Sequence, residues 1–94
     1  MSPKYCRVDE NQTEIVTKLR KLGATVQSLA TVGKGCPDIV VGHNGVNYLF
    51  EIKDGNKTPS QQKLTPDEIK WHETWKGKVY IINCIDQAIA LIGI

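Results

Sequence analysis

The chain has 94 residues, of which 40% are apolar and 23% are charged, and these proportions predict a single globular domain over residues 1–94. The net charge of +2 does not by itself indicate a nucleic-acid-binding protein, and the three cysteines and two histidines form no recognisable zinc-binding spacing. No apolar run is long enough to span a bilayer, and no signal-peptide pattern is present. We therefore expect a cytoplasmic protein without a membrane partner.

The first half of the sequence predicts a helix followed by three strands. Apolar side chains recur with the 3.6-residue period of a helix up to Gly23, which is suited to end it. Residues 24–31 alternate as a strand does. Residues 39–41 and 46–52 are β-branched, aromatic or aliphatic, and Asn44-Gly45 between them is a strong signal for a two-residue hairpin turn. Both faces of this hairpin are apolar, which is typical of central strands covered on both sides.

The second half predicts a long polar loop, a helix, a strand and a final helix. Residues 54–64 form the loop, and Thr65-Pro66-Asp67-Glu68 is a helix start with a capping threonine, an early proline and an acidic third residue. This helix should run to about Lys76, residues 78–84 should form a strand, and Asp86 should cap the last helix. The order is then α-β-β-β-α-β-α, an α/β fold with a central mixed sheet flanked by helices.

The hairpin brings two carboxylates together. Counting outward from its turn places Ile39 opposite Phe50 and Asp38 opposite Glu51. Directly opposed residues have Cβ atoms roughly 4.5–5.5 Å apart, where two like charges repel by about 3 kcal/mol at an effective dielectric constant near 20. A divalent cation between the carboxylates would replace this repulsion with attraction and make the pair a binding site. Lys53 projects from the same face as Glu51 because side chains alternate along a strand.

The charged residues of the hairpin also fit a recurring pattern. Pro37-Asp38 and Glu51-Ile52-Lys53, with twelve residues between them, match PD…(D/E)xK. The sequence therefore resembles the PD-(D/E)xK nuclease superfamily and, more closely, its small stand-alone VRR-NUC domains of phage or bacterial type. The closer similarity extends over about residues 9–92 and includes the segments 33–38, 48–54 and 64–68 and the dipeptide Trp71-His72. It implies a restriction-endonuclease-like fold.

The resemblance further implies a Mg²⁺- or Mn²⁺-dependent DNA endonuclease that hydrolyses phosphodiester bonds. Mg²⁺ prefers carboxylate oxygens and keeps several waters, so Asp38, Glu51 and the Ile52 backbone carbonyl are the expected ligands. Lys53 is expected to orient or deprotonate the attacking water and to offset negative charge that develops on the phosphorane. Asp38, Glu51 and Lys53 are thus the predicted catalytic residues.

Other positions extend the candidate site. Many VRR-NUC relatives carry an acidic residue on the first helix that faces the metal; Gln12 matches its position and would bind only as a neutral ligand or through water. Many also carry a glutamine early in the helix after the ExK strand, near the place of Glu68, which the capping box already explains as structure. Three lysines in loops that bracket the site are candidates for phosphate contacts, although solvated loop lysines have the same pattern: Lys34, Lys57 and Lys63.

The leading hypothesis is a homodimeric endonuclease that cuts branched or four-way junction DNA in replication, recombination or repair. Structure specificity and dimerisation follow from the resemblance alone, and the apolar last helix and the helix with Trp71 and Trp75 are candidate dimer surfaces. The alternatives are a restriction-type nuclease that reads sequence and a non-catalytic nucleic-acid-binding module. The opposed carboxylates argue against the binding module, which would not need them.

Overall fold

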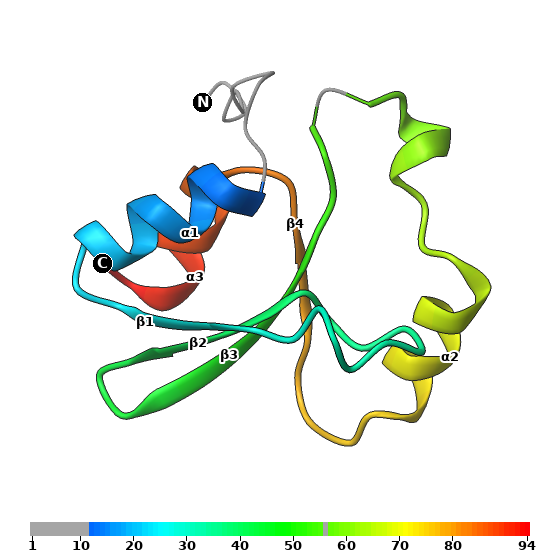
Figure 1. Ribbon diagram of the computed structural model, residues 1–94, viewed down its shortest axis with the longest axis horizontal. Coiled ribbons are helices and arrows are strands. Elements are labelled where there is room, and N and C mark those ends of the chain that lie inside the picture. The colour runs from blue at the N-terminus through cyan, green and yellow to red at the C-terminus, as the bar shows by residue number, and fades with distance from the viewer. Residues whose placement is uncertain (1–11, 56) are drawn as a thin grey trace.

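The structure is a computed structural model that describes residues 12–55 and 57–94 (Figure 1). The elements in chain order are α1 (Gln12–Lys21), β1 (Thr25–Ser28), β2 (Ile39–His43), β3 (Val46–Ile52), the 3₁₀ helix η1 (Pro59–Gln62), α2 (Pro66–Thr74), β4 (Tyr80–Ile82) and α3 (Ile85–Ile92). The strands form one sheet in the order β1-β2-β3-β4, in which β4 runs parallel to β3 and the other neighbours are antiparallel. This is the predicted α/β order, with η1 added inside the polar loop. No helix within the described residues is both long and apolar enough to cross a membrane.

The register predicted for the hairpin is confirmed. Ile39 pairs with Phe50, and the turn residues Asn44 and Gly45 have φ angles of 54° and 82°. Two successive left-handed residues are what a type I′ turn requires, which is why Asn-Gly is favoured there. Pairing continues past the end of β2, because the backbone N–H of Asp38 donates to the Phe50 carbonyl at 3.0 Å. Asp38 therefore lies beside the outer half of β3.

The apolar core lies between one face of the sheet and the helices α1 and α3. Figure 1 shows these helices together on the same side of the sheet. Alternate residues of the central strands point into this layer, so that Ile39, Val41 and Phe50 are fully buried. Burying a side chain of this kind contributes about 1.5–3 kcal/mol. The buried cluster consists of Ile15, Leu19, Ala24, Ile39, Val41, Phe50, Ile82, Ile85, Ala88 and Ile92.

The opposite face of the sheet is only partly covered by the described residues. Val40 and Leu49 point to this face and remain half-buried, and Ile81 of β4 is 52% exposed. The expectation that the central strands are covered on both faces is wrong, because α2 lies beside the sheet and none of the residues Pro66–Thr74 is fully buried. Glu51 lies on this same face, since it follows Leu49 by two residues along β3, but it is itself almost fully buried.

Helix α2 begins as predicted and ends earlier. The Thr65 hydroxyl accepts a hydrogen bond from the Glu68 backbone N–H at 3.2 Å, and the Glu68 carboxylate accepts one from the Thr65 N–H at 2.9 Å. This is the predicted capping box. The helix ends at Thr74 because Trp75 takes an extended backbone (φ −73°, ψ 127°), and the Trp75 indole stacks on that of Trp71 with ring centroids 4.6 Å apart.

The polar loop after β3 is held by hydrogen bonds of one side chain. The Gln62 amide nitrogen donates to the Lys57 carbonyl at 2.7 Å, and its oxygen accepts from the Asn83 amide at 3.3 Å. The loop is thereby tied to the segment before α3. That helix begins at Ile85, so Asp86 lies in its first turn and is not its cap. A negative charge is favourable at either place, because the N-terminus of a helix is electropositive.

Gly35 marks the point where the loop before β2 passes directly over α2. Its φ is +85°, and a Cβ atom there would overlap the backbone carbonyl of Asp67, whereas Gly33 has a φ of +74° and open space around it. We expect Gly35→Ala to lower the free energy of unfolding by about 2–4 kcal/mol, and Gly33→Ala by only the ~1–2 kcal/mol that a left-handed backbone costs an alanine. Urea unfolding measures both values, and equal losses would contradict a tight contact at Gly35.

Candidate active site

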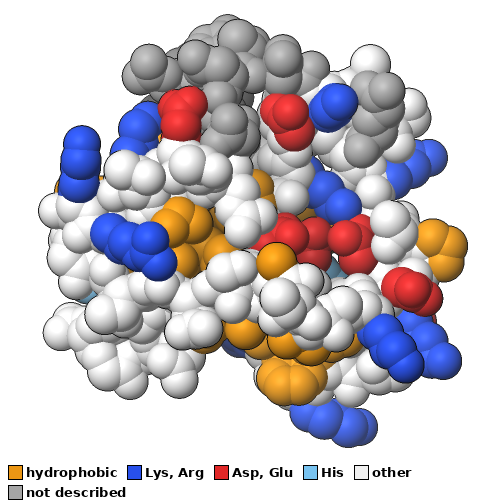
Figure 2. Space-filling view, in the orientation of Figure 1, with side chains coloured by type: hydrophobic (Ala, Val, Ile, Leu, Met, Phe, Trp, Pro, Cys, Tyr) orange, Lys and Arg blue, Asp and Glu red, His pale blue; other side chains and the backbone are white. Residues whose placement is uncertain are grey.

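The hairpin brings Asp38, Glu51 and Lys53 into one place. The Asp38 Oδ2 accepts a hydrogen bond from the Ile52 backbone N–H at 2.6 Å, which fixes this carboxylate beside the end of β3. The Lys53 Nζ lies 3.8 Å from the Glu51 Oε2. Figure 2 shows acidic side chains gathered near the centre of the molecule, in the region where Figure 1 places the space between the sheet and α2. The two carboxylates and the ammonium group therefore surround one small volume.

Glu51 is the most unusual residue of this group. It is only 2% exposed, and its Oε1 has no hydrogen-bond partner within the part of the chain that the structure describes. Burial, followed by the negative charges of Asp38 and Glu68, raises the pKa of Glu51 to about 9. Each cause disfavours the charged carboxylate. Without a bound metal ion, the protonated form of Glu51 is therefore favoured at neutral pH.

Helix α2 adds two side chains to the site. The Lys53 Nζ donates to the Glu68 Oε1 at 2.7 Å, and the His72 Nε2 lies 3.9 Å from the Glu51 Oε1. Residues 68 and 72 are one turn apart and so share a face of the helix. Burial acts to raise the pKa of Glu68, but hydrogen bonds from Lys53 and from the Thr65 N–H outweigh it and hold that pKa below its ordinary value. Glu68 is therefore a charged partner of Lys53.

The sequence explains Glu68 as part of the capping box and leaves open whether it joins the site, and it does not identify His72 as a site residue. Glu68 has both roles, since the Oε1 that accepts from the Thr65 N–H also accepts from Lys53. Glu68 and His72 are four residues apart on the helix that follows the ExK strand, and this spacing is a signal by which the pair could be found. It does not reveal which face of the helix turns toward the hairpin, because α2 has no continuous apolar stripe.

The remaining predicted residues come from other segments of the chain. Gln12 is the first residue of α1 and lines a hollow of about 430 Å³ between α1 and β1, which also includes Ile39, the residue after Asp38. Its role as a metal ligand stays a prediction, as does that of the Ile52 carbonyl. Three predicted phosphate-binding residues are exposed, one before β2 and two on either side of η1: Lys34, Lys57 and Lys63.

The donor atoms fit a hard divalent cation. A buried carboxylate oxygen without a hydrogen bond, next to a second carboxylate, is an arrangement that a cation such as Mg²⁺ would stabilise. Among the described residues, no group of three or more His, Cys, Asp or Glu side chains has the arrangement of a metal cage. Asp38 and Glu51 would thus form a partial shell, completed by water and substrate oxygens, as is usual for Mg²⁺.

Comparison with known proteins agrees with this geometry. No protein-family model matches the sequence, and no curated protein is significantly similar to it. The structure superposes on a solved structure described as "VRR_NUC domain", with a TM-score of 0.62, 26% sequence identity and coverage of 87% of this chain and 89% of that one. The chain is similar to a VRR_NUC domain. The match confirms the resemblance inferred from the PD and ExK motifs and the fold expected from it, and it supports a nuclease domain.

The raised pKa of Glu51 predicts a pH-dependent stability for this VRR_NUC-like chain. The pKa is about 9 in the folded chain against an ordinary value of 4.5, so between these pH values the folded chain holds a proton that the unfolded chain has lost. Stability is therefore highest at low pH and falls as the pH rises toward the higher value. In EDTA at about pH 8, Glu51→Gln should raise the melting temperature by about 4–8 °C, which corresponds to a gain of ~1 kcal/mol in the free energy of unfolding. Near pH 4 the rise in melting temperature should be much smaller.

The control for this measurement is Glu73→Gln, which removes an exposed carboxylate on α2. The melting temperature of this variant should differ from that of the wild type by the same amount at both pH values. A Glu51→Gln variant that gains no stability at the higher pH would contradict the proton assigned to Glu51.

Proposed function

We propose that this chain is a Mg²⁺- or Mn²⁺-dependent DNA endonuclease that hydrolyses phosphodiester bonds at Asp38, Glu51 and Lys53. The observation that supports this most directly is the Glu51 carboxylate, which is buried beside Asp38 with one oxygen that makes no hydrogen bond within the described residues. A buried polar group without a partner is costly, and a glutamine or an apolar residue at this position would avoid the repulsion. A function that needs negative charge accounts for its presence.

The roles of the residues follow from their contacts. Asp38 and Glu51 would hold the metal ion, with the Ile52 carbonyl and, directly or through water, Gln12 as further ligands. When bound, the ion polarises the scissile phosphate and lowers the pKa of a bound water. The Ile52 N–H holds the Asp38 carboxylate in place at 2.6 Å. Lys53, held at 2.7 Å by Glu68, supplies positive charge where negative charge grows on the phosphate and orients the attacking water.

The proposed substrate is branched DNA, such as a four-way junction, in replication, recombination or repair. Similarity to a VRR_NUC domain supports a nuclease, and the preference for branched DNA extends that similarity to the substrate. Lys34, Lys57 and Lys63 would contact phosphates, since all three are exposed and stand in the loops that precede β2 and follow β3. Such contacts position a strand and carry no sequence information, which suits recognition of shape.

Cleavage assays test the enzyme directly. With Mg²⁺ or Mn²⁺, we expect the wild type to cut junction DNA faster than flap, nicked or linear DNA. Asp38→Asn should lower the rate at least ~100-fold, because the amide keeps the shape of the side chain but not its charge. The matched control is Asp86→Asn, an exposed aspartate on α3, which should cut like the wild type.

Four other outcomes would reject the proposal or part of it. Absence of cleavage on every substrate, or an Asp38→Asn variant as active as the wild type, would exclude the enzyme. Cleavage of random linear DNA at one fixed sequence would favour a restriction-type nuclease. DNA binding without any divalent-metal binding that Glu51→Gln removes would favour a non-catalytic module.

We also propose that two copies form a homodimer through α2. Helix α3 buries Ile85, Ala88 and Ile92 in the core and exposes 39% of Leu91. The α2 segment exposes more apolar surface, since Ile69 and Trp75 are 43% and 47% exposed. Figure 2 shows apolar side chains gathered on the lower part of the molecule, near the lower end of β4 in Figure 1. An exposed apolar surface of this kind is typical of an interface, and a two-fold dimer would use it on both copies.

Light scattering after gel filtration should give twice the monomer mass of 10.5 kDa. Trp75→Lys should shift the protein toward the monomer. Val46→Lys, which changes a residue that is 48% exposed at the far end of the hairpin, should not. A monomeric wild type at ~100 µM, where even weak dimers form, would reject the dimer.

A further inference from the structure

A second concave surface lies along α2, next to the candidate active site. It has a volume of about 470 Å³ and is lined by Lys34, Asp67, Lys70, Trp71 and Thr74. This volume is within the range of about 300–1,000 Å³ that is typical of small-ligand sites. Of its charged groups, two are lysines and one is an aspartate, so the lining carries a net positive charge. The hollow thus combines cations with an aromatic ring.

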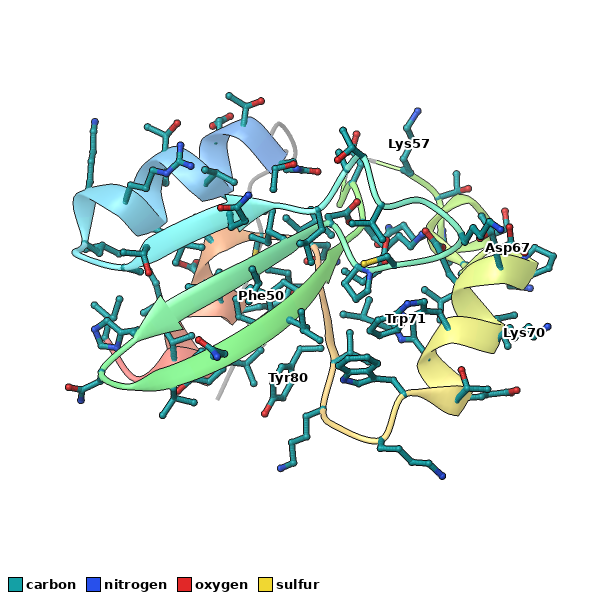
Figure 3. The ribbon with its side chains drawn as sticks, turned by 60° about the horizontal axis from the view of Figure 1, so that its bottom comes forward. Phe50, Lys57, Asp67, Lys70, Trp71 and Tyr80 are labelled. Atoms are coloured by element: carbon teal, nitrogen blue, oxygen red, sulfur yellow. The ribbon has the colours of Figure 1, made fainter. Side chains whose placement is uncertain are left out.

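The hollow and the active site occupy neighbouring stripes of one helix. At 100° per residue, positions 67, 70, 71 and 74 form one stripe of α2, and positions 68 and 72 form the next. Glu68 and His72 face Lys53 and Glu51, as their distances of 2.7 and 3.9 Å show. Figure 3 shows Trp71 on the side of α2 turned toward the sheet and Lys70 extending outward. A strand that leaves the active site around α2 would meet the hollow next.

The backbone of Lys34 is a second observation that points to this place. Lys34 has a φ of 56° and lies between Gly33 and Gly35, with φ angles of 74° and 85°. A left-handed backbone is unfavourable for lysine, and glycine or asparagine would occupy it at a lower cost. Gly35 fixes the loop against the backbone of Asp67, so Lys34 is held at the N-terminal end of α2. Strained residues of this type cluster at functional sites.

We infer that this hollow is a subsite for one unpaired nucleotide of the substrate strand. Its base lies against the Trp71 indole, and its phosphate lies between the Lys34 and Lys70 ammonium groups. Base–aromatic stacking with lysine contacts to the backbone is the general mode of single-strand recognition. Stacking on Trp75, with the ring planes 17° from parallel, holds the Trp71 indole in place. The inference rests on the proposed function, because it assigns the path of the strand beyond the cleaved phosphate.

Tryptophan fluorescence tests this subsite, since Trp71 and Trp75 are the two tryptophans of the chain. The protein in EDTA is titrated with a single-stranded oligothymidylate and with an abasic strand of the same length and charge. We expect the oligothymidylate to quench the fluorescence and to bind about tenfold more tightly than the abasic strand, which lacks the stacking partner. Equal affinities for the two strands would overturn the inference.

Substitutions locate the site. Lys34→Asn, which suits the left-handed backbone, and Lys70→Gln should each weaken binding several-fold and reduce the salt slope of log K by about 0.7, as for one lost phosphate contact. Lys78→Gln, an exposed lysine outside the hollow, is the control and should do neither. Trp71→Leu should remove the preference for bases over abasic sugar. If both hollow lysines behave like the control, the subsite is wrong, whatever happens at Trp71.

The two proposals fail separately. If Asp38→Asn abolishes cleavage of junction DNA while the hollow variants bind DNA like the wild type, the nuclease stands and the subsite is rejected. If the hollow variants lose binding but no DNA is cut with either metal, the subsite stands and the nuclease is rejected.

Discussion

The register of the β2–β3 hairpin is the constraint on which the candidate site depends. The Asn44-Gly45 turn fixes which residues face each other, and a slip of one residue would exchange the two faces of β3. Phe50 would then leave the core, and Glu51 would enter it. Because Phe50 is fully buried beneath α1 and α3, the packing of one face of the sheet keeps the carboxylate on the other. The alternation of side chains along β3 therefore determines both which residue enters the core and which carboxylate reaches the candidate site.

The charges of the site are satisfied unequally. Asp38 has the Ile52 N–H at 2.6 Å, and Lys53 has Glu68 at 2.7 Å. Among the described residues, only distant contacts remain for the Glu51 Oε1, with His72 at 3.9 Å. The unmet bonding capacity of the site is therefore concentrated on two neighbouring atoms, the Glu51 Oε1 and the His72 Nε2. A local conflict of this kind, in a chain whose other elements agree with their sequence, is typical of a functional site.

The hairpin was predictable because its determinants are local. A two-residue turn and the alternation of Ile39 and Phe50 with polar or outward-facing neighbours suffice to place Asp38 beside Glu51. The partners supplied by α2 were not predictable in the same way. That helix follows a long polar loop and buries none of the residues Pro66–Thr74, so its sequence contains no apolar stripe that shows which side faces the sheet.

Glu68 is part of both the helix cap and the candidate active site. Its carboxylate closes the first turn of α2 by accepting from the Thr65 N–H, and the same Oε1 holds Lys53. The winding of that turn and the orientation of the lysine are therefore thermodynamically coupled. Since α2 contributes no fully buried residue, its first turn can fray at a much smaller free-energy cost than that of unfolding the core. A chain in that state keeps its hairpin, its carboxylates and its hydrophobic layer. By every global measure it is folded, and yet its lysine has lost the partner that orients it.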